Sequence, residues 1–154
     1  QVGGAPLGGS GIIAGAATVG PAILWPSVAL SDPAALTLQG SLTFNSGSTD
    51  TCRLNNKKKQ SDMVTASGVT IASGAMVTAS GVTIASGAQF NLVPVAAGQL
   101  PPGMTFVVLN NVAATPISAV FANLADGATI NAGQNILQAN YEGGDGNDLT
   151  LTVQ

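Results

Sequence analysis

MVTASGVTIASGA, residues 63–75, is followed at once by the same thirteen letters at residues 76–88. Each copy divides into VTASG and VTIASG, so four short Val-Thr stretches each end at a Ser-Gly pair. Valine and threonine favour extended backbone, and glycine allows the positive φ angles of tight corners. Short extended stretches separated by corners are typical of a β-solenoid, whose stacked rungs form one continuous core.

The duplicated unit also predicts which side chains face inward. The valines and isoleucines are expected in the core, at Val64, Val69 and Ile71 and, in the second copy, at Val77, Val82 and Ile84. The threonines alternate with them and are expected outside, at Thr65, Thr70, Thr78 and Thr83. Such a threonine array can bind ice or sugars, although outward-facing threonine is also simply a good strand former.

Alternating hydrophobic residues predict further strands on both sides of the duplication. The run TFVVLN at residues 105–110 suits a buried strand, and no window combines helical apolar spacing with helix caps. The sequence therefore predicts an all-β protein. The positions expected to share a buried face are Leu36, Leu38, Leu42 and Phe44; Phe90 and Leu92; Leu137, Ala139 and Tyr141; and Leu149, Leu151 and Val153.

The 154 residues are enough for one domain with a sizeable core. We expect a single β-solenoid domain over residues 1–154. Its predicted parts are Gly-rich early rungs at 1–50, a charged loop at 51–62, the duplicated rungs at 63–92, and wider, more irregular coils or a cap at 93–154.

The composition argues against an enzyme. Charged residues make up 7% of the chain and histidine is absent, which excludes Ser-His-Asp triads, HExxH metalloproteases and imidazole acid-base chemistry. Glu142, Asp145 and Asp148 lie close together in sequence but no basic residue accompanies them, so a paired-carboxylate glycosidase is not indicated. The other acids are scattered at Asp32, Asp50, Asp62 and Asp126. No catalytic residue and no cofactor are predicted.

All four cationic residues lie within a seven-residue stretch, at Arg53 and Lys57–Lys59. No basic face can therefore follow a phosphate backbone, and nucleic-acid binding is not expected. The cluster is predicted to be a solvated loop, with an acidic partner as the alternative. Cys52, the only cysteine, is either a free or intermolecularly paired thiol or an ordinary strand-end residue.

The uncharged stretch Gly11–Leu30 is hydrophobic enough to resemble a membrane span. Pro21 and Pro26 interrupt it, and neither flank carries a cationic residue. No transmembrane segment and no signal-peptide n-region are predicted. The chain, which begins at Gln1, is expected to be a mature form or a piece of a longer protein.

Several segments occur in an order that resembles a known family: LGGSGIIAGAATVG (7–20), SLTFNSGST (41–49), VTIASGAQFNL (82–92) and NYEGGDGNDLTLTV (140–153). Together they resemble the end of a passenger-type β-helix built from bacterial autotransporter-associated β-strand repeats. The resemblance implies a right-handed parallel β-helix, export to the cell surface or the extracellular space, and a structural or adhesive role. It implies no conserved catalytic site.

The segment GGDGNDLTL at residues 143–151 is similar to the calcium-binding nonapeptide GGxGxDxUx. Gly143, Gly144, Gly146 and Asp148 match, but Thr150 stands where a large apolar residue is expected, and only one copy is present. The sequence therefore favours a glycine-rich turn with solvated acids and no metal site. Asp145 and Asp148 are the weak calcium candidates.

These observations predict a non-enzymatic structural module of an extracellular or cell-surface bacterial assembly. The low charge and the regular strand Leu149–Val153 predict self-association into homo-oligomers or fibres by backbone pairing. The alternative function is an adhesin that binds a glycan or another surface ligand, for which Trp25 is a candidate stacking platform.

Overall fold

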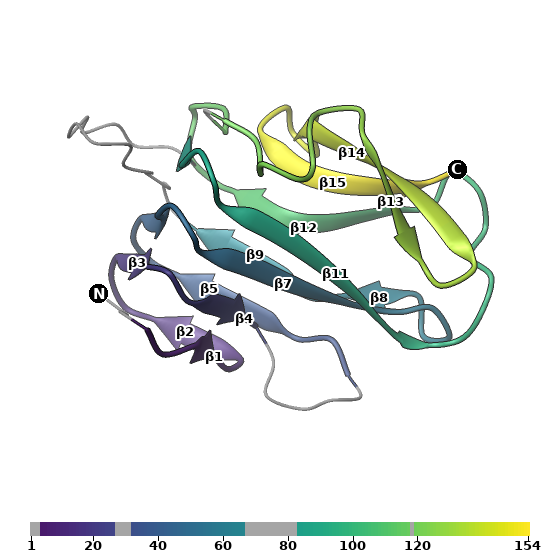
Figure 1. The fold of residues 1–154 in the computed structure, drawn as a ribbon, viewed down its shortest axis with the longest axis horizontal. Coiled ribbons are helices and arrows are strands. Elements are labelled where there is room, and N and C mark those ends of the chain that lie inside the picture. The colour runs from purple at the N-terminus through teal and green to yellow at the C-terminus, as the bar shows by residue number, and fades with distance from the viewer. Residues whose placement is uncertain (1–3, 27–31, 67–82, 118) are drawn as a thin grey trace.

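The computed structural model describes residues 4–26, 32–66, 83–117 and 119–154, which form fifteen strands in three sheets (Figure 1). Sheet A contains, in spatial order, β3 (Ala17–Val19), β6 (Leu42–Phe44) and β10 (Thr83–Ile84). Sheet B contains β1 (Leu7–Gly8), β4 (Ile23–Trp25), β7 (Thr49–Asn55) and β11 (Gln89–Ala96), with β8 (Gln60–Ser61) beside β7. Sheet C contains β2 (Gly11–Ile13), β5 (Ala35–Leu38), β9 (Met63–Ala66), β12 (Thr105–Asn111), β15 (Asp148–Val153), β14 (Asn135–Gly143) and β13 (Thr129–Ala132).

The prediction of an all-β protein is confirmed, but that of a right-handed parallel β-helix or β-solenoid is wrong. In sheet C, parallel pairing joins β2, β5, β9 and β12. The other neighbours in this sheet, β12 with β15, β15 with β14, and β14 with β13, pair antiparallel. In sheet B, β7 and β8 also pair antiparallel. Tight glycine turns make two of these reversals: Gly133, with φ 67°, lies between β13 and β14, and Gly144, with φ 60°, lies between β14 and β15. The turn from β7 to β8 contains no glycine and has Lys59 at φ 57°. The fold is therefore three sheets with both parallel and antiparallel pairing.

Two of the predicted parts also differ from the structure. Residues 93–154, expected to be more irregular, contain the regular strands β12, β14 and β15. Residues 51–62, expected as one charged loop, begin inside the buried strand β7, and the fully exposed residues are 57–60, in the turn before β8 and at its first residue. Backbone pairing to β11 along Thr51–Asn55, and to β8 at Leu54 and Asn55, explains this difference.

The core follows the predicted alternation. Val64 and Ile84 are buried as expected, whereas Val69, Ile71, Val77 and Val82 lie outside the described residues. Thr65 is partly exposed, and Thr70, Thr78 and the Thr83 side chain are not described. The other positions predicted to share a buried face are all in the core: Leu36, Leu38, Leu42, Phe44, Phe90, Leu92, Leu137, Ala139, Tyr141, Leu149, Leu151 and Val153.

Glycines determine how the chain turns from sheet C to sheet A. Residues 14–16 connect β2 to β3, and residues 39–41 connect β5 to β6, each with glycine in the middle. Gly15 has φ 145°, and a Cβ added to Gly40 would lie 2.5 Å from the carbonyl carbon of Gly15. The two corners are therefore stacked so closely that Gly40 cannot carry a side chain.

An aromatic cluster closes the end of the core beneath the antiparallel strands. The ring of Phe121 lies 5.5 Å from both Phe44 and Phe90, measured between ring centroids. The Asn123 amide donates to the Phe90 carbonyl at 2.7 Å and accepts from the Phe90 N–H at 2.8 Å, as a neighbouring strand would.

Among the described residues, no helix is long and apolar enough to cross a membrane.

The duplication leads to a prediction about chain length. The first copy provides β9 and the second provides β10, so residues 67–82 connect them where the equivalent connections have three residues. Deleting residues 69–81 removes one repeat length and leaves Ser-Gly-Val, again with glycine in the middle. We expect the shortened protein to keep its far-ultraviolet circular dichroism spectrum. Its free energy of unfolding should stay within about 1 kcal/mol of the parent's or exceed it, since the number of residues between two strands has a shallow effect on stability.

Candidate functional site

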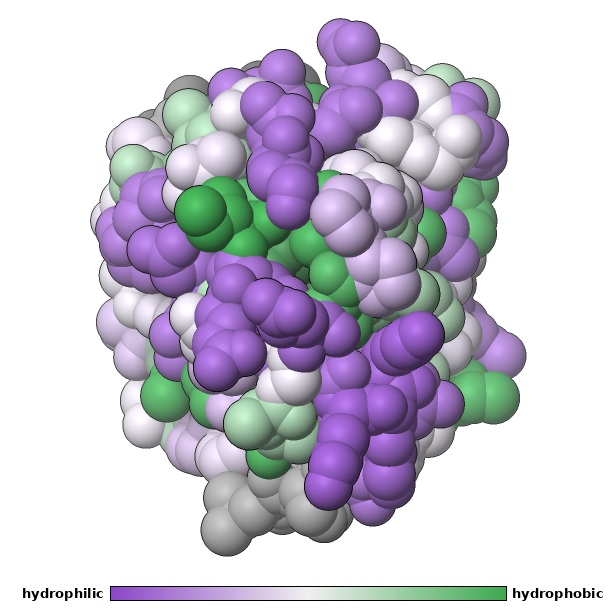
Figure 2. Space-filling model, turned by 90° about the vertical axis from the view of Figure 1, so that its right-hand side faces the viewer, coloured by the Kyte–Doolittle hydropathy of each residue, from purple (hydrophilic) through white to green (hydrophobic). Residues whose placement is uncertain are grey.

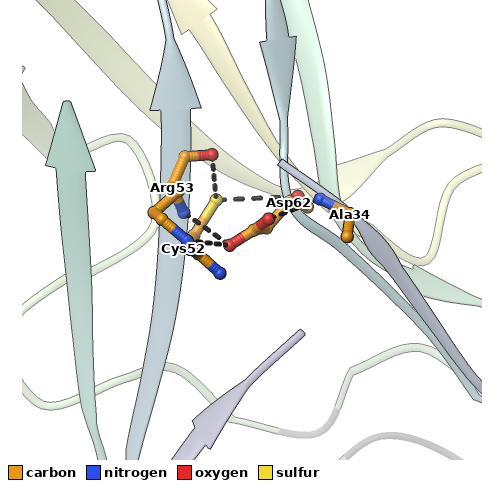
Figure 3. A network of polar contacts seen from close by, with 4 residues as sticks. All are labelled: Ala34, Cys52, Arg53 and Asp62. Atoms are coloured by element: carbon orange, nitrogen blue, oxygen red, sulfur yellow. Dashed lines mark hydrogen bonds and ion pairs between the residues drawn. The ribbon is translucent and has the colours of Figure 1, made fainter. Parts of the chain in front are cut away.

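The densest polar cluster surrounds Asp62, which is 1% exposed and lies between β8 and β9 (Figure 3). Its Oδ2 atom accepts hydrogen bonds from the backbone N–H of Arg53 at 3.0 Å and from Arg53 Nε at 3.2 Å. Its Oδ1 atom accepts from the backbone N–H of Ala34 at 2.7 Å. The carboxylate thus joins β7 to the chain that enters β5.

Arg53 is a buried structural residue, so the prediction of a fully solvated cationic cluster is wrong for it. The side chain is 2% exposed, and its guanidinium carbon lies 4.8 Å from the centre of the Trp25 ring. A cation over an indole face is electrostatically favourable, and the ion pair with Asp62 adds to this. Lys57, Lys58 and Lys59 are exposed as expected, and Lys58 forms an ion pair with Asp32.

Two further ionisable groups, Asp50 and Cys52, lie on the core-facing side of β7. Burial, and to a smaller extent the charge of Asp62, raises the pKa of the Asp50 carboxyl to about 8. Burial also raises the pKa of the Cys52 thiol, helped by the charges of Asp50 and Asp62. At neutral pH Asp50 is protonated and Cys52 is a thiol. The alternative of a reactive thiolate is therefore not supported.

Of the weak calcium candidates, Asp145 lies in the turn between β14 and β15, and Asp148 is the first residue of β15. Asp145 is exposed, whereas Asp148 is buried and its Oδ1 atom accepts a hydrogen bond from the Asn111 N–H at 2.8 Å. A Cβ added to Gly144 would lie 1.9 Å from Asp148 Oδ2, so this glycine leaves room for the carboxylate. Asp148 thereby holds the end of β12, and burial raises its pKa.

In the part of the chain that the structure describes, no three His, Cys, Asp or Glu side chains lie close enough together to hold a metal ion. Glu142, near the end of β14, is exposed. Asp32 and Asp62 are engaged with Lys58 and Arg53, and Asp126 accepts from the Tyr141 N–H at 3.0 Å. Asp32, Asp62 and Asp126 thus have partners within the fold.

Trp25, the candidate stacking platform, lines a groove of about 320 Å³ on the outer face of sheet B. Ile23, Val93 and Val95 make most of this groove apolar, with Asn91 at its side. Arg53 lies against one face of the indole ring, so that face is not open to a sugar. The sequence could suggest the tryptophan but not the arginine that covers it.

A second hollow lies at the end of the molecule where the C-terminus is found. Figure 2 views this end and shows hydrophobic residues recessed between hydrophilic ones. A pocket of about 280 Å³ there is bordered by Leu100, Ile136 and Val153 together with glutamines at 99, 134 and 154. None of its lining residues is charged or nucleophilic, so the pocket offers no catalytic group.

No protein-family model, no curated protein and no solved structure matches this chain. The resemblance to autotransporter-associated repeats therefore stays a prediction. Function has to be inferred from the residues and their geometry.

The ion pair of Arg53 and Asp62 leads to a prediction for stability. Replacing Asp62 with alanine leaves the buried guanidinium without this carboxylate and removes the acceptors of Arg53 N–H and Ala34 N–H. We expect Asp62→Ala to lower the free energy of unfolding by about 3–5 kcal/mol, measured by urea denaturation. The exposed Asp145→Ala serves as the control and should change it by less than about 0.5 kcal/mol. Equal effects of the two variants would contradict a structural role for the pair.

The buried Asp50 leads to a prediction for pH dependence. Its pKa is about 8 in the folded protein and about 4 in an unfolded chain. The unfolded state therefore releases its proton first, and stability falls as the pH rises from about 4 to about 8.

Asp50→Asn should remove this part of the pH dependence in thermal unfolding curves. The variant should resemble the parent at pH values near 4 and be more stable than the parent above about 8. Asp145→Asn, in the exposed turn, should leave the parent's slope unchanged. A stability difference between the parent and Asp50→Asn that stays constant across this interval would contradict a raised pKa of Asp50 in the fold.

Proposed function

We propose that this chain is a non-enzymatic structural module that associates with a second copy of itself through the strand edges of β1, β2 and β3. The observation that carries the proposal is the coincidence of three sheet edges at one end of the described molecule. In the described residues, β1, β2 and β3 each have a strand neighbour on one side only. Unpaired strand edges present backbone donors and acceptors to any strand that approaches.

The side chains at this end do nothing to prevent such pairing. No residue before Asp32 is charged, so the lysines that usually protect exposed edges are missing. Ile12, in the middle of β2, is 69% exposed. Removing an apolar side chain of this size from water adds a hydrophobic contribution to the backbone pairing.

At the opposite end, β10 and β11 are also terminal strands of their sheets, but other groups cover part of that end. Phe121 covers the core there, and Asn123 satisfies the backbone of β11 at Phe90. The strand Leu149–Val153, which the sequence analysis expected to extend a neighbour's sheet, is β15 and pairs with β12 on one side and β14 on the other. That route is therefore corrected, because β15 has no free edge.

A two-fold arrangement of two copies satisfies these constraints. Rotation by 180° places β2 antiparallel to β2 of the second copy and brings the two Ile12 side chains together near the axis. The contact uses few charges, so its strength should depend little on salt. A location outside the cell or at its surface is part of the same proposal and is supported by the sequence resemblance.

Binding of a glycan is the second candidate function. The groove at Trp25 favours it, because an aromatic ring with a nearby amide at Asn91 is a common setting for a sugar. The apolar lining and the Arg53 contact make it the weaker candidate. A monomeric parent that binds oligosaccharides in a calorimetric titration would favour this function.

Sedimentation equilibrium of the parent and two variants tests the proposal. Ile12→Lys places a charge in the middle of the β2 edge, and it should weaken association at least about tenfold, since charges on edges oppose pairing. Ile136→Lys is the matched control: Ile136 is 49% exposed but lies on β14, which has strands on both sides. It should associate like the parent. A parent that is monomeric at all concentrations, or equal loss in both variants, overturns the proposal.

A further inference from the structure

Sheet C contains a gap that is separate from the edges of β1, β2 and β3. The pairing of β12 with β9 begins at Leu109 opposite Val64, although β12 extends back to Thr105. The chain before β9 does not continue this ladder, because β8 pairs antiparallel with β7. Within the described residues, the Thr105–Val107 side that faces away from β15 therefore has no paired strand.

A cleft of about 410 Å³ occupies this position. One side of it is formed by Phe106 and Val107 of β12, and the other by Ser61 of β8 with Lys59 before it. Met63, at the start of β9, also lines it. The lining mixes apolar side chains with backbone and polar groups, which is what an extended peptide requires.

The charge at the rim distinguishes this cleft from the rest of the surface. The sequence contains four cationic residues, and Arg53 is buried, so the exposed ones are Lys57, Lys58 and Lys59 in the turn before β8. Lys59 lines the cleft itself. Lys58 is engaged with Asp32, which leaves Lys59 in the cleft lining and Lys57, in the same turn but outside the lining, to attract negative charge.

We propose that the cleft binds an extended acidic peptide segment of another protein, which adds a short strand along β12. Main-chain hydrogen bonds to Thr105–Val107 provide affinity, and acidic side chains next to Lys57 and Lys59 provide selectivity. A neutral or basic peptide lacks the second contribution. The site does not depend on association of the chain with itself.

Fluorescence anisotropy with three labelled peptides on the full chain tests this proposal. The probes are Glu-Val-Glu-Val-Glu, its glutamine analogue, and the acidic peptide with alternate backbone nitrogens methylated. The acidic peptide should bind at least about tenfold more tightly than the glutamine analogue, and more weakly as salt is added. The methylated peptide should bind at least about tenfold more weakly than its parent, because it cannot donate the strand hydrogen bonds.

Protein variants locate the site. Lys57→Gln with Lys59→Gln should weaken binding of the acidic peptide about tenfold while leaving the circular dichroism spectrum unchanged, because both side chains are exposed. Glu142→Gln, at an exposed position of β14, is the control for net charge and should not weaken binding. No binding of the acidic peptide, or equal binding of the methylated peptide, overturns the proposal. So does an unchanged affinity in the double lysine variant.

These outcomes are independent of the sedimentation experiment. Ile12→Lys should bind the acidic peptide like the parent, because Ile12, on β2, is not among the residues that line the cleft. Failure of peptide binding with intact self-association rejects the cleft alone. Peptide binding without self-association rejects only the proposed dimer.

Discussion

A single buried carboxylate determines how the chain passes from one sheet to the next. Asp62 accepts hydrogen bonds from β7 and from the entrance of β5, and its own N–H donates to the Arg53 carbonyl at 2.8 Å. It thereby sets where β8 ends and where β9 begins. Burying an ion pair this deeply has a large desolvation cost. Its main effect here is to fix the position of β7 relative to the start of β5. Because β9 begins only after Asp62, its pairing with β12 starts at Leu109. Thr105–Val107 of β12 is therefore left without a paired strand on that side.

The sequence predicted which residues are buried far better than which strands are neighbours. A period-two pattern identifies the inner face of a strand, and positions such as Leu38, Phe44 and Leu151 are in the core as expected. The pattern says nothing about the partner strand. The glycine turns at Gly133 and Gly144 carry the signal for antiparallel pairing, but solenoid corners are also rich in glycine. The Val-Thr repeats therefore led to the prediction of a solenoid.

The candidate site was less predictable, for a related reason. Arg53 is one of a run of cations and therefore suggested a solvent-exposed loop. What buries it is the ion pair with Asp62 and the contact with Trp25, and these residues meet only through the tertiary fold. Asp148 matched a calcium motif, but its carboxylate is used by Asn111. In both cases residue type alone predicted an exposed side chain. The side chain is buried instead, because it interacts with a residue that is distant in the sequence.

Cys52 gives the molecule a built-in reporter. It is the chain's only cysteine, it lies within the central part of β7, and its buried thiol is protonated at neutral pH. An alkylating reagent can reach the sulfur only when sheet B opens around it. The rate of labelling therefore measures how often the strands on either side of β7 separate, without any engineered probe. Fast reaction would indicate local opening of the sheet, and reaction at the global unfolding rate would indicate that all three sheets open together.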